Sequence, residues 1–526
     1  MKPLISILGL TSLSAAFHGQ GHAAKPLQSR PNILIAIADD QSFPHAGVYG
    51  CPWVATPAFD RVAAEGILFN NCYTPNAKSA PSRACLLTGR NSWQLEEAGN
   101  HIGFWPDGKY PTFCEVLADN GYYAAFTGKG WAPGNPGMAN GKPRRLTGIP
   151  FQKRKTTPST PKISNVDYAA NFKDFLDSKP AGKPWVFWFG SHEPHRAYEF
   201  CSGVAQGKKS LSDIDFVPRF WPDNDTVRYD MLDYAYEIEH FDSHLGAMLT
   251  MLEKAGELDN TIIVVTADNG MPFPRCKGLE YEYSNHLPLA IMWKKRIRNA
   301  GRIAEQYISF IDLAPTFLCL AGLDAKNCGM EPAGREITDL LADKPRHDRS
   351  YILLGQERHD YGRPQNQGYP IRSILEDGWL YVHNFKPELW PAGNPETGYL
   401  NTDGSPTKSV ILNARRNGQD TRLWELSFGK HPAEELYHIT TDQECLHNLA
   451  ENPTLTERKE RMKRLLFEEL RKQQDPRVCG NGDIFDQYPF FQQSSSYFYE
   501  RYMDGKIEKY QTGWVNPSDY EINKLD

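Results

Sequence analysis

Four short runs of the sequence contain almost no polar residue, and they constrain the fold more than any other feature. They read NILIAIA (directly before Asp39), YYAAFTG (122–128), WVFWFGS (185–191) and TIIVVTA (261–267). A strand with one face in water alternates polar and apolar residues, whereas a strand covered on both faces does not. These runs therefore predict neighbouring strands of a parallel sheet that helices cover on both sides.

Segments with helical periodicity lie between these runs. PAFDRVAAEG and TFCEVLADNG have the apolar spacing of short helices, and a longer stretch runs from about residue 229 to 256, where a glycine stops it. Alternating strands and helices are typical of an α/β domain. We predict such a domain, with a large mixed but mostly parallel sheet, over residues 25–350.

The pattern changes after about residue 350. SYILLG, YPIRSILEDGWLYVHNF and AEELYHI suit shorter strands between turns, and residues 453–475 have the periodicity of an amphipathic helix. We predict a smaller α+β domain with an antiparallel sheet over residues 351–526. From residue 480 the chain is rich in aromatic residues. We favour packing against the first domain for this tail over a platform on which sugars stack.

Residues 1–24 resemble a secretory signal peptide. Lys2 precedes an apolar segment, residues 4–16, that is too short to cross a bilayer, and His22-Ala23-Ala24 suits a cleavage site. We therefore expect an exported protein without a transmembrane segment. The ten cysteines include no CxxC pair, which disfavours a zinc site. The net charge of −6 argues against nucleic-acid binding.

Polar and charged residues follow each of the four apolar runs. In chain order they are Asp39 and Asp40, Lys129, His195 within HEPHR, and Asp268 and Asn269. Ligands of open α/β sheets bind at the carboxyl ends of the strands, so these side chains are expected to meet at one edge. Each motif alone is more often a turn or a surface residue, but their shared position favours a site.

The acidic and amide side chains among these residues predict a metal site. Their oxygen atoms are hard ligands, which suit Ca²⁺ or Mg²⁺ better than zinc or copper. Lys129, His195 and Lys277 would then face an anionic group beside the metal ion. That arrangement stabilises the charge that develops in sulfuryl or phosphoryl transfer.

Ser79 begins the stretch SAPSRACLLTGR. Pro81 suits the first turn of a helix and Gly89 suits its end, so we predict a short helix over about 81–88 with Ser79 just before it. A helix N-terminus favours bound oxyanions, and Arg83 is close enough to reach one. Ser79 would also serve as a helix N-cap. These residues by themselves do not separate a capping serine from a nucleophile.

The stretch from Ser79 to Arg90 resembles the signature of the sulfatase family, [C/S]-x-P-S-R-x-x-x-L-T-G-R, at every fixed position. The resemblance covers nearly the whole mature chain and includes PNILIAIADDQ, HEPHR, ADNG and ELYHITTDQECLHNLAENP. It implies an alkaline-phosphatase-like α/β domain. It also implies that the C-terminal domain contributes to the substrate pocket.

In this family the signature Cys or Ser is oxidised to formylglycine, so the resemblance implies that Ser79 is modified by a maturating radical enzyme, a transient partner. Ser-type sites resemble those matured in anaerobic bacteria, which implies an exported protein of the bacterial periplasm. One hydroxyl of the hydrated aldehyde would attack sulfur, and deprotonation of the other would expel sulfate. The implied ligands of one Ca²⁺ are Asp39, Asp40, Asp268, Asn269 and residue 79 itself. The implied contacts of formylglycine, sulfate and leaving group are Arg83, Lys129, His195 and Lys277.

One position departs from the family pattern. Many sulfatases have Gly-Lys-x-His where this chain has Gly128-Lys129-Gly130-Trp131. The imidazole that is missing at Trp131 would have to be replaced by His195 or by a histidine elsewhere, such as His101.

Within the family the chain resembles the heparan N-sulfatases, through ADNGMPFPR, SHEPHR, YPIRS with LYVHNF, and DPRVCG. This implies hydrolysis of the S–N bond of a terminal N-sulfated glucosamine in heparin or heparan sulfate, a sulfated glycosaminoglycan. His101, His359 and Arg372 are candidate substrate contacts. The alternatives are an O-sulfatase on another sulfated glycan, a phosphoester or phosphonate hydrolase, and a non-catalytic glycan-binding protein. The full signature disfavours the phosphatase, and the intact acids and lysines disfavour the binder.

Overall fold

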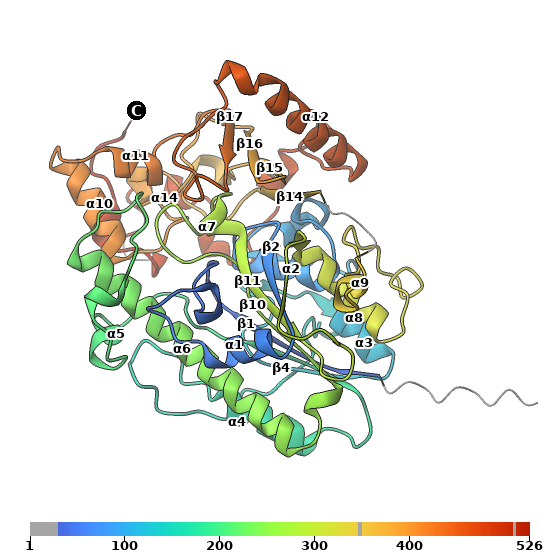
Figure 1. Cartoon of the computed structure of the whole chain (residues 1–526). Coiled ribbons are helices and arrows are strands. Elements are labelled where there is room, and N and C mark those ends of the chain that lie inside the picture. The colour runs from blue at the N-terminus through green and yellow to red at the C-terminus, as the bar shows by residue number, and fades with distance from the viewer. Residues whose placement is uncertain (1–29, 346–349, 509–511, 526) are drawn as a thin grey trace, which may run out of the picture.

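The computed structural model describes residues 30–345, 350–508 and 512–525, so the predicted signal peptide lies outside the described residues (Figure 1). The four apolar runs form β1 (Asn32–Ala38), β4 (Tyr123–Gly128), β9 (Trp185–Gly190) and β10 (Thr261–Ala267). Every residue of β1, β9 and β10 is buried. The absence of polar alternation was therefore a correct sign of strands covered on both faces.

These four strands lie side by side in a nine-stranded sheet. Its order is β12-β2-β11-β10-β1-β9-β4-β8, with β13 also paired to β2. The strands from β10 to β8 are parallel, and β11 is antiparallel to both of its neighbours. The other strands are β2 (Ile67–Tyr73), β8 (Ile149–Pro150), β11 (His286–Met292), β12 (Arg302–Ala304) and β13 (Ile308–Ser309). The mixed, mostly parallel sheet is confirmed, and four neighbouring strands end at one edge.

Two groups of helices cover this sheet (Figure 1). One group consists of α1 (Pro57–Ala64), α4 (Tyr168–Ser178) and α6 (Asp225–Lys254), and the other of α2 (Ser79–Thr88), α3 (Phe113–Asp119) and α8 (Leu313–Leu320). The longest helix, α6, begins earlier than the expected start near residue 229. Asn224 is the reason, because its side chain accepts a hydrogen bond from the N–H of Val227 and caps the helix there.

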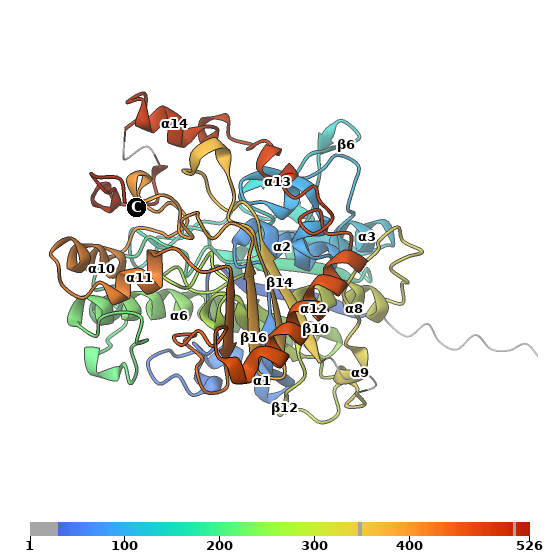
Figure 2. The same cartoon turned by 90° about the horizontal axis from the view of Figure 1, so that it is seen from above.

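The chain after residue 350 forms a second, antiparallel sheet (Figure 2). Its strands are β14 (Tyr351–Gln356), β15 (Ile371–Glu376), β16 (Trp379–Asn384) and β17 (Glu434–His438). The helix α12 (Thr456–Lys472) covers one face through Met462, Leu466 and Leu470. The other face packs against Tyr73 and Tyr281 of the N-terminal part. The antiparallel sheet is confirmed, whereas the domain boundary at residue 350 stays a prediction.

Short elements connect these layers. They are β3 (Gly103–Phe104), β5 (Gly134–Asn135), β6 (Met138–Ala139), β7 (Lys142–Pro143), α5 (Ser202–Ala205), α7 (Glu282–Asn285), α9 (Thr338–Leu341), α10 (Pro406–Arg416), α11 (Arg422–Phe428), α13 (Ile484–Gln487) and α14 (Phe498–Met503). Within the described residues, no helix is long and apolar enough to cross a membrane.

The aromatic tail after residue 480 packs mainly inward. Phe490, Phe498 and Tyr520 share an apolar cluster with Ile102 and Tyr361. Ile102 belongs to the N-terminal part and Tyr361 to the C-terminal part, so the buried rings of the tail pack against both parts. Tyr497 is an exception, with 56% of its surface exposed.

Leu245 on α6 provides a test of this packing. Its side chain is fully buried in the core beneath the large sheet. We expect Leu245→Ala to lower the free energy of unfolding by about 2–5 kcal/mol, because it removes buried methyl groups and leaves a cavity. Chemical denaturation measures this loss. Thr250→Ala, at an exposed position of the same helix, is the matched control and should change stability by about 0.5 kcal/mol or less.

Candidate active site

Three acidic residues meet where β1 and β10 end. Oxygen atoms of Asp39, Asp40 and Asp268 lie within 4.8 Å of one another, and all three residues are buried. The N–H of Asp40 donates to Oδ1 of Asp268 (2.9 Å), and Nδ2 of Asn269 donates to Oδ1 of Asp40 (2.7 Å). Buried carboxylates this close together need a counter-charge, and their oxygens are the ligands of hard divalent ions. The donor set therefore fits a hard divalent metal ion, which these residues would hold.

The backbone at Asp40 is part of how this cluster forms. Asp40 has φ 74°, in the left-handed region that few non-glycine residues adopt. This conformation turns the chain at the end of β1, so that Asp39 and Asp40 both contribute to the site although they are adjacent in sequence. Strain of this kind is tolerated where the surroundings hold it, as the hydrogen bond to Asp268 does here.

Lys129 and Arg83 bind the acids from one side. Nζ of Lys129, directly after β4, lies 2.9 Å and 2.6 Å from the two carboxylate oxygens of Asp39. Nε of Arg83 donates to Oδ2 of Asp268 (2.8 Å), and Arg83 is fully buried. Strand ends and the helix α2 thus supply the partners that the sequence pattern predicted for this edge.

These contacts separate the pKa values of two of the acids. Burial raises the pKa of Asp39, but the charges of Lys129 and Arg83 outweigh it and hold that pKa well below its usual range. For Asp268, burial and the charge of Asp39 raise the pKa to about 6, although Arg83 opposes the shift. The raised pKa of Asp268 means that the cluster favours an additional positive charge beside this carboxylate.

The hydroxyl of Ser79 faces this cluster. Its Oγ lies 3.0 Å from Oδ1 of Asp39, 3.0 Å from Nζ of Lys129 and 3.4 Å from Oδ1 of Asn269. The helix α2 begins at Ser79, two residues earlier than predicted, and its N-cap is Lys78. Ser79 therefore does not cap the helix, and its chemical role stays a prediction.

The neighbours of Ser79 in the signature fasten α2 to the strand ends. The hydroxyl of Ser82 donates to the carbonyl of Asp268, and Nη1 of Arg83 donates to the carbonyl of Lys129 (3.0 Å). Gly89 ends the helix with φ 72°, as its position predicted. The fixed positions of the signature thus have a structural reason: they hold residue 79 against the acids.

Lys277 and His195 lie on the other side of Asp40. Nζ of Lys277 is 2.7 Å from Oδ2 of Asp40, and Nε2 of His195 is 3.8 Å from the same atom. Nζ of Lys277 is also 3.1 Å from Oδ2 of Asp403. Burial lowers the pKa of Lys277, but Asp40 and Asp403 outweigh it and raise that pKa, so this lysine stays charged.

Trp131 has a packing role at the position where many sulfatases have histidine. Its Nε1 donates to the carbonyl of Ala80 (2.9 Å), and its ring meets Trp105 edge-on with centroids 5.2 Å apart. The indole thereby supports the first turn of α2. Of the two histidines considered as replacements, His195 and His101, the structure places His195 beside the acid cluster.

Two of the three expected substrate contacts lie close to the signature. Nδ1 of His101 is 2.9 Å from Oδ1 of Asp360, and Oδ2 of Asp360 is 2.6 Å from Nζ of Lys78. Nε2 of His359 is 2.7 Å from Oδ1 of Asn76, and His359 is fully buried. A role for His101 and His359 in substrate binding stays a prediction.

The position of Arg372 contradicts a contact with substrate. Its guanidinium is fully buried, and its five N–H groups are used by Asp475, Glu357 and the carbonyls of Gln356 and Ile371. No donor is left for a ligand. Arg372 instead ties β15 to the residues that follow α12.

Three further residues of this region were not predicted: Lys78, Asp360 and Asp403. Lys78 and Asp360 adjoin Ser79 and His359, so their positions in sequence were a usable signal. Asp403 lies in a loop without a recognisable motif. It reaches Lys277 only because the C-terminal part folds over the edge of the sheet.

A family model described as Sulfatase matches residues 31–323, which is more than half of the chain. The chain belongs to the sulfatase family. This sulfatase is therefore a hydrolase, of a family that uses formylglycine and a divalent metal ion, and the acid cluster with Ser79 is where both would act.

Relatives and solved structures match most of the chain. The N-sulphoglucosamine sulphohydrolase of Homo sapiens is 25% identical over 88% of this chain and 94% of its own length. The N-acetylglucosamine-6-O-sulfatase of Bacteroides thetaiotaomicron is 27% identical over 61% of this chain and 73% of its own. A structure described as a complex with the substrate D-glucosamine-2-N,6-O-disulfate covers 85% of this chain and 98% of its own, with a TM-score of 0.59 and 20% identity.

Binding of Ca²⁺ to the acid cluster is testable by melting temperature. A cation that binds only the folded protein stabilises it, so Ca²⁺ should raise the melting temperature of the wild type by about 3 °C or more, and a chelator should reverse this. Asp40→Asn should abolish the shift. Asp233→Asn, which changes a buried carboxylate outside the cluster, should retain it. Equal shifts in the two variants would refute the assignment.

Proposed function

We propose that this sulfatase hydrolyses the N-sulfate of a terminal glucosamine in heparin or heparan sulfate. The observation that carries the proposal is the similarity to an N-sulphoglucosamine sulphohydrolase along nearly the full length of both chains. That length includes the C-terminal part, whose Asp403 contacts the catalytic Lys277. The similarity therefore includes residues of the acid cluster's surroundings from both the N-terminal and the C-terminal part of the chain.

The nucleophile in this proposal derives from Ser79. Oxidation of its CH₂OH group to an aldehyde removes one H₂, and the hydrated aldehyde has two hydroxyls where serine has one. One hydroxyl attacks sulfur, and the other later loses its proton to expel sulfate, an exit that a sulfated serine lacks. Nζ of Lys129, 3.0 Å from Oγ of Ser79, stabilises negative charge on the attacking oxygen.

The acids would hold one Ca²⁺ together with Asn269 and residue 79, and the ion supplies Lewis-acid polarisation at the sulfate oxygens. Lys277, kept charged by Asp40 and Asp403, neutralises the sulfate from the opposite side. The side chain of His195 is 32% exposed, so it borders both the cluster and the space from which a substrate enters. We assign His195 the transfer of a proton to the leaving nitrogen as the S–N bond breaks.

Maturation of Ser79 has a structural constraint. Ser79 is 1% exposed, and every residue of α2 is buried. A maturating enzyme therefore reaches Ser79 only while this segment is still unfolded. For an exported protein, as residues 1–24 predict, we infer that the oxidation would occur before the chain folds in the periplasm.

An O-sulfatase is the second candidate function. It is favoured by the similarity to a glucosamine-type 6-O-sulfatase, although this covers less of the chain than the similarity to the N-sulfatase. The same catalytic residues would serve either reaction, because both transfer a sulfuryl group from a sugar. The difference lies in which atom of the sugar meets His195.

Mass spectrometry tests the modification. Trypsin cleaves after Lys78 and Arg83 and releases the peptide SAPSR. In protein from its native host, we expect this peptide to be lighter by one H₂ and to react with a carbonyl reagent. Protein from a host without the maturating enzyme is the control and should give the unmodified peptide. An unmodified peptide in active native protein would sink the proposed mechanism.

Sulfate release tests the substrate. We expect the enzyme to turn over N-sulfated glucosamine faster than 6-O-sulfated or 2-O-sulfated sugars by about 10²-fold or more. The reason is that the leaving atom must lie beside His195, which protonates it. Ion chromatography of free sulfate measures the rates, with Ser79→Ala as the inactive control. Equal or faster release from an O-sulfated sugar would transfer the assignment to the second candidate.

A further inference from the structure

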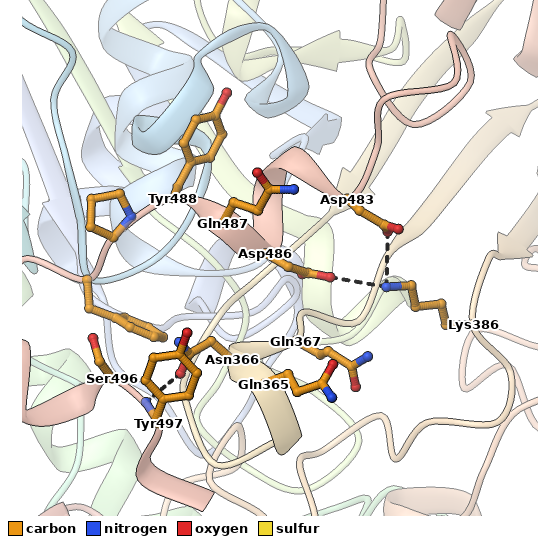
Figure 3. A pocket seen from close by; sticks show the side chains of 12 residues that line it. Gln365, Asn366, Gln367, Lys386, Asp483, Asp486, Gln487, Tyr488, Ser496 and Tyr497 are labelled. Atoms are coloured by element: carbon orange, nitrogen blue, oxygen red, sulfur yellow. Dashed lines mark hydrogen bonds and ion pairs between the residues drawn. The ribbon is translucent and has the colours of Figure 1, made fainter. Parts of the chain in front are cut away.

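A cavity of about 420 Å³ opens on the C-terminal part of the protein (Figure 3). It is lined by residues 365–367, by Lys386 after β16, by Asp483 and residues 486–490 around α13, and by residues 496 and 497. Its volume is within the range of ligand sites, about 300–1,000 Å³. None of its lining residues belongs to the acid cluster or to the contacts of Ser79.

The lining has the chemistry of a carbohydrate site. The side-chain amides of Gln365, Gln367 and Gln487 form no hydrogen bond with another residue that the structure describes. Each amide offers a donor and an acceptor at fixed separation, which suits sugar hydroxyl and acetamido groups. The rings of Tyr488 and Tyr497 flank the space (Figure 3), and an exposed aromatic face suits the apolar face of a sugar ring.

The cavity is preformed. Gln365, Asn366 and Tyr497 have φ of 57°, 59° and 51°, in the left-handed region that is costly for such side chains. Hydrogen bonds between its two walls hold this backbone: Oδ1 of Asn366 accepts from the N–H of Tyr497 (2.6 Å), and Oε1 of Glu500 accepts from the N–H of Gln365 (2.7 Å). A fixed site loses little entropy when a ligand binds.

The charges of the cavity exclude a sulfate group. Lys386 is the one cation among its lining residues, and its Nζ lies 3.2 Å from Oδ1 of Asp483 and 3.1 Å from Oδ2 of Asp486. A sulfate in the cavity would therefore meet two carboxylates and a lysine that is already paired. Arg358 stacks on the buried Phe490 at 3.8 Å behind the wall and is itself buried.

A thin layer of residues separates the cavity from the neighbourhood of Ser79. The N–H of His101 donates to the carbonyl of Arg358 (3.0 Å), and the guanidinium of Arg358 lies on Phe490, which lines the cavity. His101 in turn pairs with Asp360 and, through it, with Lys78. The cavity and the catalytic residues are thus distinct, and a chain of side-chain and backbone contacts connects them.

We propose that this cavity binds an unsulfated sugar residue of a glycan chain, with the ring stacked on Tyr497 and its hydroxyls on the amides of residues 365, 367 and 487. The choice of a glycan rests on the proposed function, whereas the preference for an unsulfated residue rests on the cavity's own charges. Binding at this second point raises the local concentration of the chain near the active site.

Calorimetric titration of the full chain with Ser79 unmodified tests this without any turnover. The probe is an unsulfated tetrasaccharide of alternating N-acetylglucosamine and glucuronate, of which an uncharged N-acetylglucosamine residue is expected in the cavity. We expect the wild type to bind it, and Tyr497→Ala and Gln367→Ala each to bind about tenfold more weakly. Phe216→Ala and Gln419→Ala, exposed positions outside the cavity, are the matched controls and should bind like the wild type.

Three results would overturn the proposal. One is no binding by the wild type at millimolar probe, and another is equal binding by the cavity variants and the controls. The third is tighter binding of the N- and O-sulfated form of the tetrasaccharide, with a loss of that binding in Tyr497→Ala. Unchanged melting temperatures establish that the variants are folded. A failure of N-sulfate hydrolysis would be seen in sulfate release and would leave this binding result intact.

Discussion

The repulsion among three buried carboxylates is the constraint on which the rest of this structure depends. Asp39, Asp40 and Asp268 are held within a few ångströms of one another where water does not screen them. Lys129, Lys277 and Arg83 offset part of that charge, and each of them comes from a different segment. The fold must therefore bring distant parts of the chain together with high accuracy before the site exists.

The parallel sheet is the means of doing so. The neighbouring strands β10, β1, β9 and β4 end at the same edge of the sheet, so the residues that follow these strands lie close to one another. The helix α2 then adds Ser79 and Arg83, and hydrogen bonds from Ser82 and Arg83 fix its first turn to the strand ends. The same close packing that fixes the position of residue 79 also makes it inaccessible, so the oxidation that we propose would have to precede folding.

The C-terminal part contributes ion pairs to the site, and it also contains a cavity whose lining residues differ from those of the site. Asp403 pairs with Lys277, and Asp360 pairs with both Lys78 and His101, so this part borders the signature directly. A layer further out, the cavity beside Lys386 is lined by amides and tyrosines in place of exposed cations. A metal-dependent centre for sulfate and a cavity without an unpaired cation for unsulfated sugar would together suit a chain that is only partly sulfated.

Much of the fold and of the site was present in the sequence. Uninterrupted apolar runs predicted the buried strands, since only strands covered on both faces lack alternation, and the motif after each run predicted Asp39, Asp40, Lys129, Asp268 and Asn269. The signature located Ser79. Pro81 predicted that a helix begins near residue 81, whereas the helix begins at Ser79 itself. The tertiary structure alone decided what each polar side chain contacts. It excluded Arg372 from the substrate contacts, because other residues accept all five of its N–H groups. It added Asp403 and Asp360, which pair with lysines more than a hundred residues away in the sequence. The physical reason is that a strand or helix is set by local pattern, whereas the partner of a buried charge depends on how separate segments pack.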